Sequence, residues 1–289
     1  NPIDGVVLLC GCDKTTPAQL MGAASADIPS IMVPGGPMLK GVFRNKEVGS
    51  GTDVWHYWDE LRAGRISEED WCELESCMSR SAGDCMVMGT ASTMAALAEA
   101  MGMMLPGGAA IPAVMAERRR HAEATGRTIV TAIQKDLKPS RILSKRSFEN
   151  AIRILMAIGG STNAIIHLTA IAKRIGIQLT LADFNRIGDQ TPVLVNLKPN
   201  GKYYMEDLAK SGGIPTVMKE LEESLYCQAS TINGKTIEEN LIEVPSPPEW
   251  QDVIKTRNNP LLEGQGLTCL FGNLAPTGAI IKRSAASTH

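Results

Sequence analysis

The sequence has no marked excess of charge of either sign: 29 Lys and Arg residues stand against 31 Asp and Glu residues, for a net charge of -2. Nucleic acids and anionic membranes usually attract proteins with a basic excess, which this chain lacks. No apolar run reaches the length needed to span a bilayer, and no basic and apolar leader opens the sequence. We therefore expect neither a nucleic-acid partner nor a membrane partner.

Cysteine is too sparse and too irregularly spaced for a secreted disulfide scaffold. The thiols are Cys10, Cys12, Cys72, Cys77, Cys85, Cys227 and Cys269. Disulfide scaffolds are short and dense in cysteine, whereas this chain has 289 residues and an odd number of thiols. We therefore expect a reducing, cytoplasmic compartment, in which some of these thiols are available as metal ligands.

The sequence also lacks internal repeats and low-complexity tracts, and its two ends lack the signals with which a protein chain usually starts and stops. It begins with Asn1 rather than with an initiator Met, and it stops at His289 without a helix cap or another stop signal. We expect it to be a segment of a longer protein. Its hydrophobic content of 44% is enough to bury one sizeable core.

What the chain does contain is an alternation of strands and helices that is typical of a parallel sheet. Apolar runs at 6–10 and 28–33 predict two strands, and the segment 17–24 predicts a helix between them, which together form a βαβ unit. A capping-box pattern at Ser67 and Asp70 opens another helix. The remaining expected elements are helices at 92–101, 147–158, 162–175 and 214–225 and a strand at 129–133. The predicted fold class is α/β, with a parallel sheet and helices on both of its faces.

The character of the sequence changes near Pro245-Ser-Pro-Pro248. Beyond this point, two short strand-like runs at 267–271 and 278–282 are separated by turn residues. We therefore predict an α/β domain at 1–245, followed at 246–289 by a linker and the first strands of a second domain.

The strongest functional signal is the segment in which the first strand runs into Gly11, Cys12, Asp13 and Lys14 and then into a helix. Ligands of open parallel sheets bind beyond the carboxyl ends of the strands. The positive end of the helix dipole favours a thiolate at Cys12, and Asp13 offers a hard oxygen ligand. The local sequence favours Lys14 as a salt-bridge partner, with a reactive amine as the alternative.

A second cysteine of interest, Cys85, lies in a glycine-flanked loop just before a helix. Spacing alone does not distinguish a ligand at this position from a buried structural thiol, which is the commonest fate of a lone cysteine. The loop 159–163 is able to present backbone N–H groups to an oxyanion, but such loops are more often tight turns. His167 lies in an apolar helical pattern and is expected to be a satisfied core histidine.

Five stretches together resemble the dehydratase family that contains dihydroxy-acid dehydratase, phosphogluconate dehydratase and the sugar-acid dehydratases. They are Gly11-Cys-Asp-Lys-Thr-Thr-Pro17, Gly83-Asp-Cys-Met-Val-Met-Gly-Thr-Ala-Ser-Thr-Met94, Ala157-Ile-Gly-Gly-Ser-Thr-Asn163, Tyr204-Met-Glu-Asp207 and Gly272-Asn-Leu-Ala-Pro276. They follow one another in family order through nearly the whole chain. The aldonate (pentonate) branch is the most similar, because dihydroxy-acid dehydratases more often have Asn in place of Ser92, and because 49–55 also resembles that branch.

The resemblance implies an iron–sulfur cluster and a magnesium site. Cys12 and Cys85 match two of the three cysteines that hold the cluster, which is expected to be [2Fe–2S], with [4Fe–4S] as the alternative. Asp13 matches a magnesium ligand. Lys14 matches a lysine that is carried as its carbamate, an oxygen donor that suits Mg²⁺. This implication reverses the local interpretation of Lys14.

The activity implied by the resemblance is that of a hydro-lyase acting on a small sugar acid, a pentonate or a hexonate, to give a 2-keto-3-deoxy acid. The cluster acts as a Lewis acid on the departing hydroxyl, and Mg²⁺ binds the substrate carboxylate. Thr15, Ser161 and Thr162 are expected to contact the substrate. The base serine, the first cluster cysteine and further acidic ligands would lie outside 1–289, so this segment alone is expected to be inactive. The family also implies a homodimer or homotetramer, and we expect the second domain to be β-barrel-like.

Three alternatives remain open. Dihydroxy-acid dehydratase of branched-chain amino-acid synthesis shares the chemistry and differs in the substrate. A non-catalytic domain would keep the fold and bind no cluster; a brown colour that disappears on Cys85→Ser would argue against it. An enzyme with Lys14 as a Schiff-base nucleophile would form an adduct with a keto acid that borohydride traps.

Overall fold

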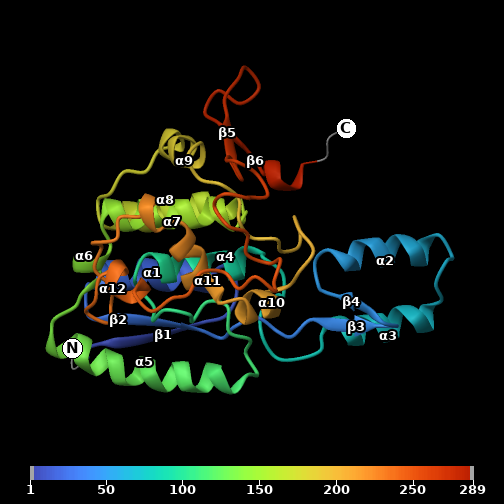
Figure 1. Ribbon diagram of the computed structural model, residues 1–289, viewed down its shortest axis with the longest axis horizontal. Coiled ribbons are helices and arrows are strands. Elements are labelled where there is room, and N and C mark those ends of the chain that lie inside the picture. Colours follow the sequence, from blue (N-terminus) through green and yellow to red (C-terminus); the bar gives the residue numbers. More distant parts are fainter. Residues whose placement is uncertain (1–2, 287–289) are drawn as a thin grey trace.

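The computed structural model describes residues 3–286, and its centre is a small parallel sheet between helical layers (Figure 1). β1 (Val6–Cys10) pairs in parallel with β2 (Ser30–Pro34), with Val6 opposite Ser30, and α1 (Thr15–Ala26) connects the two strands. All five residues of β2 are buried, as expected for a strand of a parallel sheet that is covered on both faces. The predicted βαβ unit is confirmed.

Helices cover both faces of this sheet. The long helix α5 (Ala116–Gln134) packs on one face and α1 on the other, with α4 (Thr90–Ala100) beside α1. The helices α7 (Lys145–Ala157) and α8 (Asn163–Arg174) form the next layer (Figure 1). Ten of the eleven residues of α4 are buried. Five of these eleven residues are alanines, whose small side chains let neighbouring helices approach from several sides. The predicted α/β class and the helices predicted at 92–101, 147–158 and 162–175 are confirmed, whereas α5 was not predicted.

Shorter elements complete the body of the molecule. They are α6 (Pro139–Ile142), α9 (Leu181–Gly188), α10 (Met205–Lys210), α11 (Gly213–Glu220), α12 (Ile237–Leu241) and the 3-10 turns Glu222–Ser224 and Arg283–Ala285. The helix expected at 214–225 therefore ends five residues early, and a 3-10 turn follows it. No helix in residues 3–286 combines the length and the apolarity that crossing a membrane requires.

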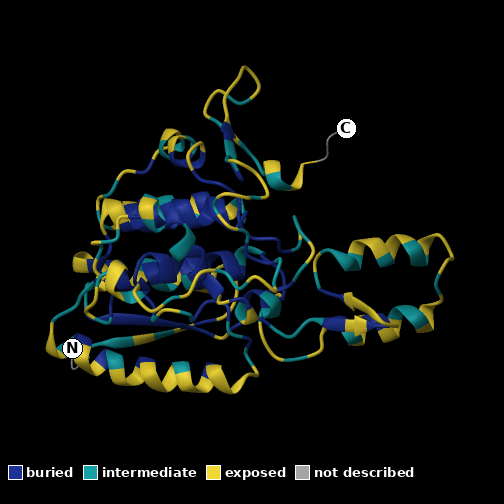
Figure 2. Ribbon diagram, viewed as in Figure 1, coloured by how far each residue is buried: buried dark blue, intermediate teal, exposed yellow. Residues whose placement is uncertain are grey.

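Residues 41–78 form an arm that projects from the body (Figure 1, right). It consists of the hairpin β3 (Gly41–Phe43) and β4 (Lys46–Val48) and of the helices α2 (Asp53–Arg62) and α3 (Glu68–Met78). The capping box predicted at the start of α3 is present. The arm has a small core of its own, formed by Phe43, Val48, Leu74 and Met78, whereas α2 has no buried residue (Figure 2).

The two ends of the arm meet at its base. The amide of Leu39 donates a hydrogen bond to the hydroxyl of Ser81 (2.9 Å), so the chain enters and leaves the arm at the same place. On the body side, Lys198 Nζ lies 3.0 Å from both carboxylate oxygens of Asp53 and 2.7 Å from the hydroxyl of Tyr204. Polar contacts therefore fix the arm to the body.

The strand predicted at 129–133 is wrong, because these residues form the last part of α5. A run of β-branched residues favours a strand, but the buried positions Thr125, Ile129 and Ala132 are spaced as one face of a helix. Val130 is 54% exposed on the opposite face. Packing of that one face against the sheet outweighs the local preference of the run for a strand.

The last part of the described chain forms an antiparallel hairpin of β5 (Thr268–Leu270) and β6 (Ala279–Ile281), which packs against α9. The segment before it is joined to the body by single bridges, Ile254 with Val195 and Leu262 with Val193. The two predicted strands are thus present as a hairpin. The division at 245 and the β-barrel-like character of the second domain stay predictions.

Candidate functional site

Cys12, Asp13 and Lys14 lie in the loop between the end of β1 and the start of α1. The hydroxyl of Thr15 folds this loop, because it donates to the carbonyl of Cys12 (2.9 Å) and accepts from the amide of Gly11 (3.2 Å). Lys14 Nζ lies 2.7 Å from Asp13 Oδ2, and this hydrogen bond lowers the pKa of Asp13. Cys12 is exposed, so its thiol is available to a ligand.

The loop after β2 continues the contact between the two strands. The amide of Gly35 donates to the carbonyl of Cys10, the last residue of β1, over 2.6 Å. Cys12 therefore lies two residues beyond a point at which the ends of both strands are joined. This is the carboxyl edge of the sheet, where the sequence predicts a ligand site.

Cys85 lies next to the same loop. The carbonyl of Gly36 accepts from the amide of Asp84 (2.9 Å), and the amide of Met38 donates to the carbonyl of Asp84 (2.9 Å). Backbone hydrogen bonds thus connect the end of β1, through the loop after β2, to the residue before Cys85. The two cysteine-bearing loops lie at one edge of the sheet, and Cys85 is exposed like Cys12.

Gly83 makes this pairing possible. It has a φ of +134°, and a Cβ at this position would lie 2.4 Å from the backbone nitrogen of Met38. Any other residue would push the two backbones apart and break the hydrogen bonds of Asp84. The glycine before Cys85 therefore has a specific structural role that the sequence did not reveal.

The loop before α8 is joined to the start of α4, the helix that follows the Cys85 loop. The hydroxyls of Ser161 and Thr90 lie 2.7 Å apart, the amide of Ser161 donates to Thr93 Oγ1 (3.1 Å), and Asn163 Nδ2 donates to Thr90 Oγ1 (3.2 Å). Thr162 precedes α8, and its side chain makes no capping hydrogen bond. The predicted substrate residues Ser161 and Thr162 thus lie beside the helix to which the Cys85 loop leads.

His167 on α8 is not the satisfied core histidine that the sequence predicts. It is half-buried, and its Nε2 is buried without a hydrogen-bond partner among residues 3–286. Burial lowers its pKa, and the charges of Lys14 and Asp13 act on its ring. The packing of α8 against α1 places it in the electrostatic neighbourhood of these two residues. No spacing motif in the sequence indicated this position.

A buried carboxyl group supports the loop behind the sheet edge. Glu99 of α4 is 4% exposed and accepts hydrogen bonds from the amides of Gly107 (2.6 Å) and Ala109 (2.9 Å). Burial raises the pKa of Glu99 to about 7. Its carboxyl group replaces the water that these backbone amides would otherwise bind.

A metal cluster or ion at this edge has the right kinds of donor but an incomplete set. The thiols of Cys12 and Cys85 suit iron–sulfur clusters, and the carboxylate of Asp13 suits Mg²⁺. Within the part of the chain that the structure describes, no three His, Cys, Asp or Glu side chains are arranged to hold a metal. The residues therefore fit the predicted groups in chemistry and would need further ligands to complete either site.

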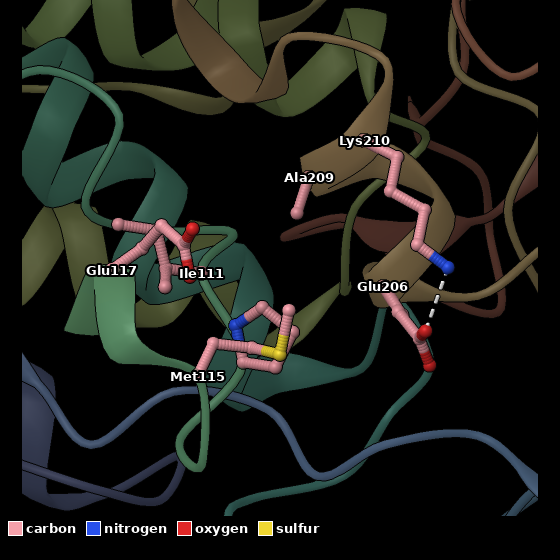
Figure 3. Close-up of a pocket in the computed structure, with 7 residues that line it drawn as sticks. Ile111, Met115, Glu117, Glu206, Ala209 and Lys210 are labelled. Carbon is pink, nitrogen blue, oxygen red and sulfur yellow. Dashed lines mark hydrogen bonds and ion pairs between the residues drawn. The ribbon is translucent and has the colours of Figure 1, made fainter.

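A separate hollow of about 220 Å³ lies between the segment before α5 and helix α10 (Figure 3). Ile111, Pro112, Met115 and Ala209 give it a mainly apolar lining, and the ion pair of Glu206 with Lys210 (2.7 Å) lies on one side. None of the predicted site residues lines this hollow. It is therefore not the site that the sequence predicts.

The sequence pattern of the N-terminal domain of dihydroxy-acid and 6-phosphogluconate dehydratases matches residues 1–240. The chain belongs to this family. The match spans the βαβ unit, the arm and the helical layers, together with all seven site residues that the sequence predicts. The resemblance drawn from the five sequence stretches is thus confirmed at the level of the family.

Individual relatives agree with this assignment. The chain is 53% identical over 292 residues to L-arabinonate dehydratase of Rhizobium leguminosarum bv. trifolii (strain WSM2304), covering 100% of this chain and 50% of that protein. It is 52% identical over 290 residues to L-arabonate dehydratase of Azospirillum brasilense, covering 99% and 49%. It is 44% identical over 288 residues to dihydroxy-acid dehydratase of Thermodesulfovibrio yellowstonii (strain ATCC 51303 / DSM 11347 / YP87), covering 100% and 52%. The chain therefore spans about half the length of these curated relatives.

Proposed function

We propose that the full-length protein is a hydro-lyase that removes water from a sugar acid, a pentonate or a hexonate, to give a 2-keto-3-deoxy acid. The observation that carries this proposal is the difference in identity between relatives: 53% and 52% to the two arabinonate dehydratases, against 44% to the dihydroxy-acid dehydratase. Identity to 6-deoxy-6-sulfo-D-gluconate dehydratase of Pseudomonas putida is also 44%, so the difference favours a pentonate over a hexonate. Ser92, one of the positions that resembles the sugar-acid branch, is 2% exposed. Its influence on substrate choice would therefore act through the packing of α4.

We assign Cys12 and Cys85 as two ligands of a [2Fe–2S] cluster, with [4Fe–4S] as the alternative, and Asp13 and carbamylated Lys14 as ligands of Mg²⁺. Support comes from the position of both loops at the carboxyl edge of the sheet and from the matching donor chemistry. When bound, these groups would supply Lewis acids for the departing hydroxyl and the substrate carboxylate. Cys12 and Cys85 are exposed, so neither thiol has to leave a packed core to become a ligand.

Lys14 is the residue whose chemistry changes most in this proposal. Its side chain is 71% exposed, so carbon dioxide has free access to Nζ. The Lys14 cation first loses one proton to give the neutral amine. The amine nitrogen then forms a bond with the carbon of carbon dioxide and releases a second proton, so that the cation becomes an anion. The present ion pair with Asp13 then becomes a repulsion, which a divalent cation between the two oxygen donors would reverse.

The proposed substrate residues differ in what their hydroxyls already do. Thr15 uses its hydroxyl within the Cys12 loop, and Ser161 uses its hydroxyl on Thr90. We therefore expect these two residues to hold the loops that face the substrate. Thr162, whose side chain makes no capping bond, is the better candidate for direct contact with the substrate.

Other parts of the proposal concern the full-length protein. We propose that the base serine, a third cluster cysteine and further acidic magnesium ligands lie outside residues 1–289, so that this segment alone is inactive. We also propose that the hairpin of β5 and β6 begins a β-barrel-like domain from about residue 246. The protein would act as a homodimer or homotetramer in the cytoplasm.

The decisive experiment is a comparison of substrates with the full-length protein, purified without oxygen. We expect kcat/KM for L-arabinonate or a related sugar acid to exceed that for 2,3-dihydroxy-3-methylbutanoate by at least about tenfold, equivalent to ~1.4 kcal/mol of transition-state binding. A preference for the branched dihydroxy acid would support the dihydroxy-acid dehydratase alternative instead. Absence of turnover together with absence of bound iron and sulfide would support the cluster-free domain.

A further inference from the structure

Arg118, in the first turn of α5, is a buried cation behind the loops at the sheet edge. Its side chain is 7% exposed, and its Nη2 donates to the carbonyls of Gly108 (2.8 Å) and Ile111. Its Nε and Nη1 are buried without a hydrogen-bond partner among residues 3–286. A guanidinium is costly to bury when its donors are unpaired, so this position requires a compensating charge.

Asp84 provides such a charge. It is half-buried, and its Oδ1 is buried without a hydrogen-bond partner in the described chain. Burial lowers the pKa of Arg118, and the negative charges of Asp84 and Glu99 oppose this shift. Asp84 and Glu99 therefore make the burial of the guanidinium less costly.

Arg118 also supports the residue that pairs with Asp84. The carbonyl of Ile111, which Arg118 holds, would lie 2.4 Å from a Cβ at Gly36, and Arg118 Nη2 itself would lie 2.8 Å from it. The amide of Ala113 donates to the carbonyl of Pro37 over 2.9 Å. The segment 108–113, whose carbonyls accept from Arg118, is thus packed directly against the loop after β2.

These contacts form a continuous path from Arg118 to Cys85. Arg118 fixes the segment 108–113, this segment supports Gly36 and Pro37, and Gly36 accepts the hydrogen bond of the Asp84 amide. The negative charge of Asp84 also acts on the same guanidinium. Asp84 is therefore held by its backbone hydrogen bonds to Gly36 and Met38, and Cys85 is the next residue.

We propose that Arg118 is a positioning residue for Cys85. It fixes the orientation of Cys85 at the sheet edge, and it acts through Asp84 and the loop after β2. This inference rests on the proposed role of Cys85 as a cluster ligand. Supporting groups behind a metal ligand set its orientation, and their loss commonly weakens the site by 10–100-fold. In this role Arg118 acts through other residues and needs no contact of its own with the cluster or the substrate.

The test uses the full-length protein with its cluster, and compares Arg118→Met and Arg118→Lys with the control Arg120→Met. Arg120 lies on the same helix but is 67% exposed and pairs with Glu117 on the surface. We expect Arg118→Met to speed the loss of iron to a chelator at least about tenfold and to change the visible circular dichroism of the cluster. Arg118→Lys should restore part of both properties, and Arg120→Met should match the wild type. The proposal is overturned if Arg118→Met also matches the wild type.

A second measurement separates positioning from general stability and needs no cluster. Hydrogen exchange in cluster-free protein should become faster at the amides of Asp84 and Met38 in Arg118→Met, while amides in the middle of α7 keep their protection. Equal acceleration throughout the protein would show a merely structural role and refute the inference.

If Arg118→Met does not fold, Asp84→Asn replaces it, because it keeps the shape of the side chain and removes its charge. The same local acceleration is expected, and wild-type exchange at Asp84 and Met38 would overturn the inference. If the wild-type protein binds no cluster, the proposed function fails, whereas the exchange measurement still decides whether Arg118 positions Cys85.

Discussion

The hydroxyl oxygen of Ser161 lies 2.7 Å from that of Thr90, which joins the turn between α7 and α8 to the first residue of α4. Asn163 Nδ2 donates to the same Thr90 oxygen. Because α4 follows directly from the loop that contains Cys85, this turn and the candidate ligand loop form one hydrogen-bonded unit. A substitution in the turn between α7 and α8 is therefore expected to alter the structure of the Cys85 loop, and a substitution in that loop to alter the turn.

Replacement of Ser161 with Ala should lower the free energy of unfolding by about 1 kcal/mol. It removes the hydrogen bond to Thr90 at a partly buried site, together with the longer one (3.3 Å) that the hydroxyl accepts from the amide of Asn163. Urea unfolding measures this change. The control is Ser25→Ala, which removes an exposed hydroxyl on α1 that bonds only the carbonyl of Met21. Its effect should stay within about 0.5 kcal/mol. Equal effects of the two substitutions would show that the Ser161–Thr90 pair contributes nothing.

Two glycines should respond in opposite ways to replacement with Ala. A Cβ at Gly160 would lie 2.7 Å from Leu155 Cδ1 and 2.9 Å from Thr93 Cγ2, so Gly160→Ala should destabilise the protein by about 1–3 kcal/mol. Gly22 lies within α1 and has open space around it, so Gly22→Ala should stabilise the protein by about 0.5–1 kcal/mol. Thermal unfolding of both variants tests the signs, and a neutral Gly160→Ala would show that the turn adjusts easily.

Loss of either candidate cluster ligand should remove the cluster. We expect Cys12→Ser and Cys85→Ser in the full-length protein to lose visible absorption and most of the bound iron and sulfide. Cys72 is exposed on α3 of the arm, so Cys72→Ser should keep all three signals. Retention of the full absorption by Cys85→Ser would remove this residue from the ligand set.

The buried carboxyl of Glu99 should make stability depend on pH. Its pKa is raised from 4.5 to about 7 in the folded protein, so ionisation costs the folded state more than the unfolded state. The stability that the protonated carboxyl of Glu99 gives the folded protein is therefore fully present below pH 4.5. It is lost as the pH rises to 7, and stability changes no further with this group above that value. The decline should amount to about 3 kcal/mol.

Glu99→Gln should abolish this part of the pH dependence. Relative to the wild type, the variant should gain stability as the pH rises from 4.5 to 7, as measured by urea unfolding at several pH values. The control Glu123→Gln changes an exposed carboxylate that pairs with Arg127 on the surface, so its effect on stability should stay small at every pH tested. A constant difference for Glu99→Gln would contradict the raised pKa.

The sequence predicted several elements of the body, and helix α3 of the arm, because their signals were local. The apolar runs of β1 and β2, the capping box at Ser67 and Asp70 and the alanine-rich pattern of α4 each lie within a few residues of the element they specify. The prediction of a strand at 129–133 was wrong for the same reason. Its local preference favours a strand, and only its packing against the sheet makes it helical.

The site was predictable only in part. The residues around Cys12 carried a recognisable pattern, but their connection to Cys85 depends on backbone hydrogen bonds between Gly36 and Asp84, which no local pattern encodes. Arg118 was hidden because it stands in a run of three arginines that reads as a solvated surface. Only its spacing of seven residues from the buried Thr125 hints that it lies on the inner face of α5.

The meeting of the two arm ends at Leu39 and Ser81 has an evolutionary consequence. A segment that leaves and re-enters the body at one point is exchangeable as a cassette, because a short turn is enough to close the gap behind it. Since the arm has its own core, such an exchange would leave the packing of α4 and α7 untouched. Lengthening, shortening or replacement of this segment is therefore a route by which the fold could diversify while the sheet edge keeps its chemistry.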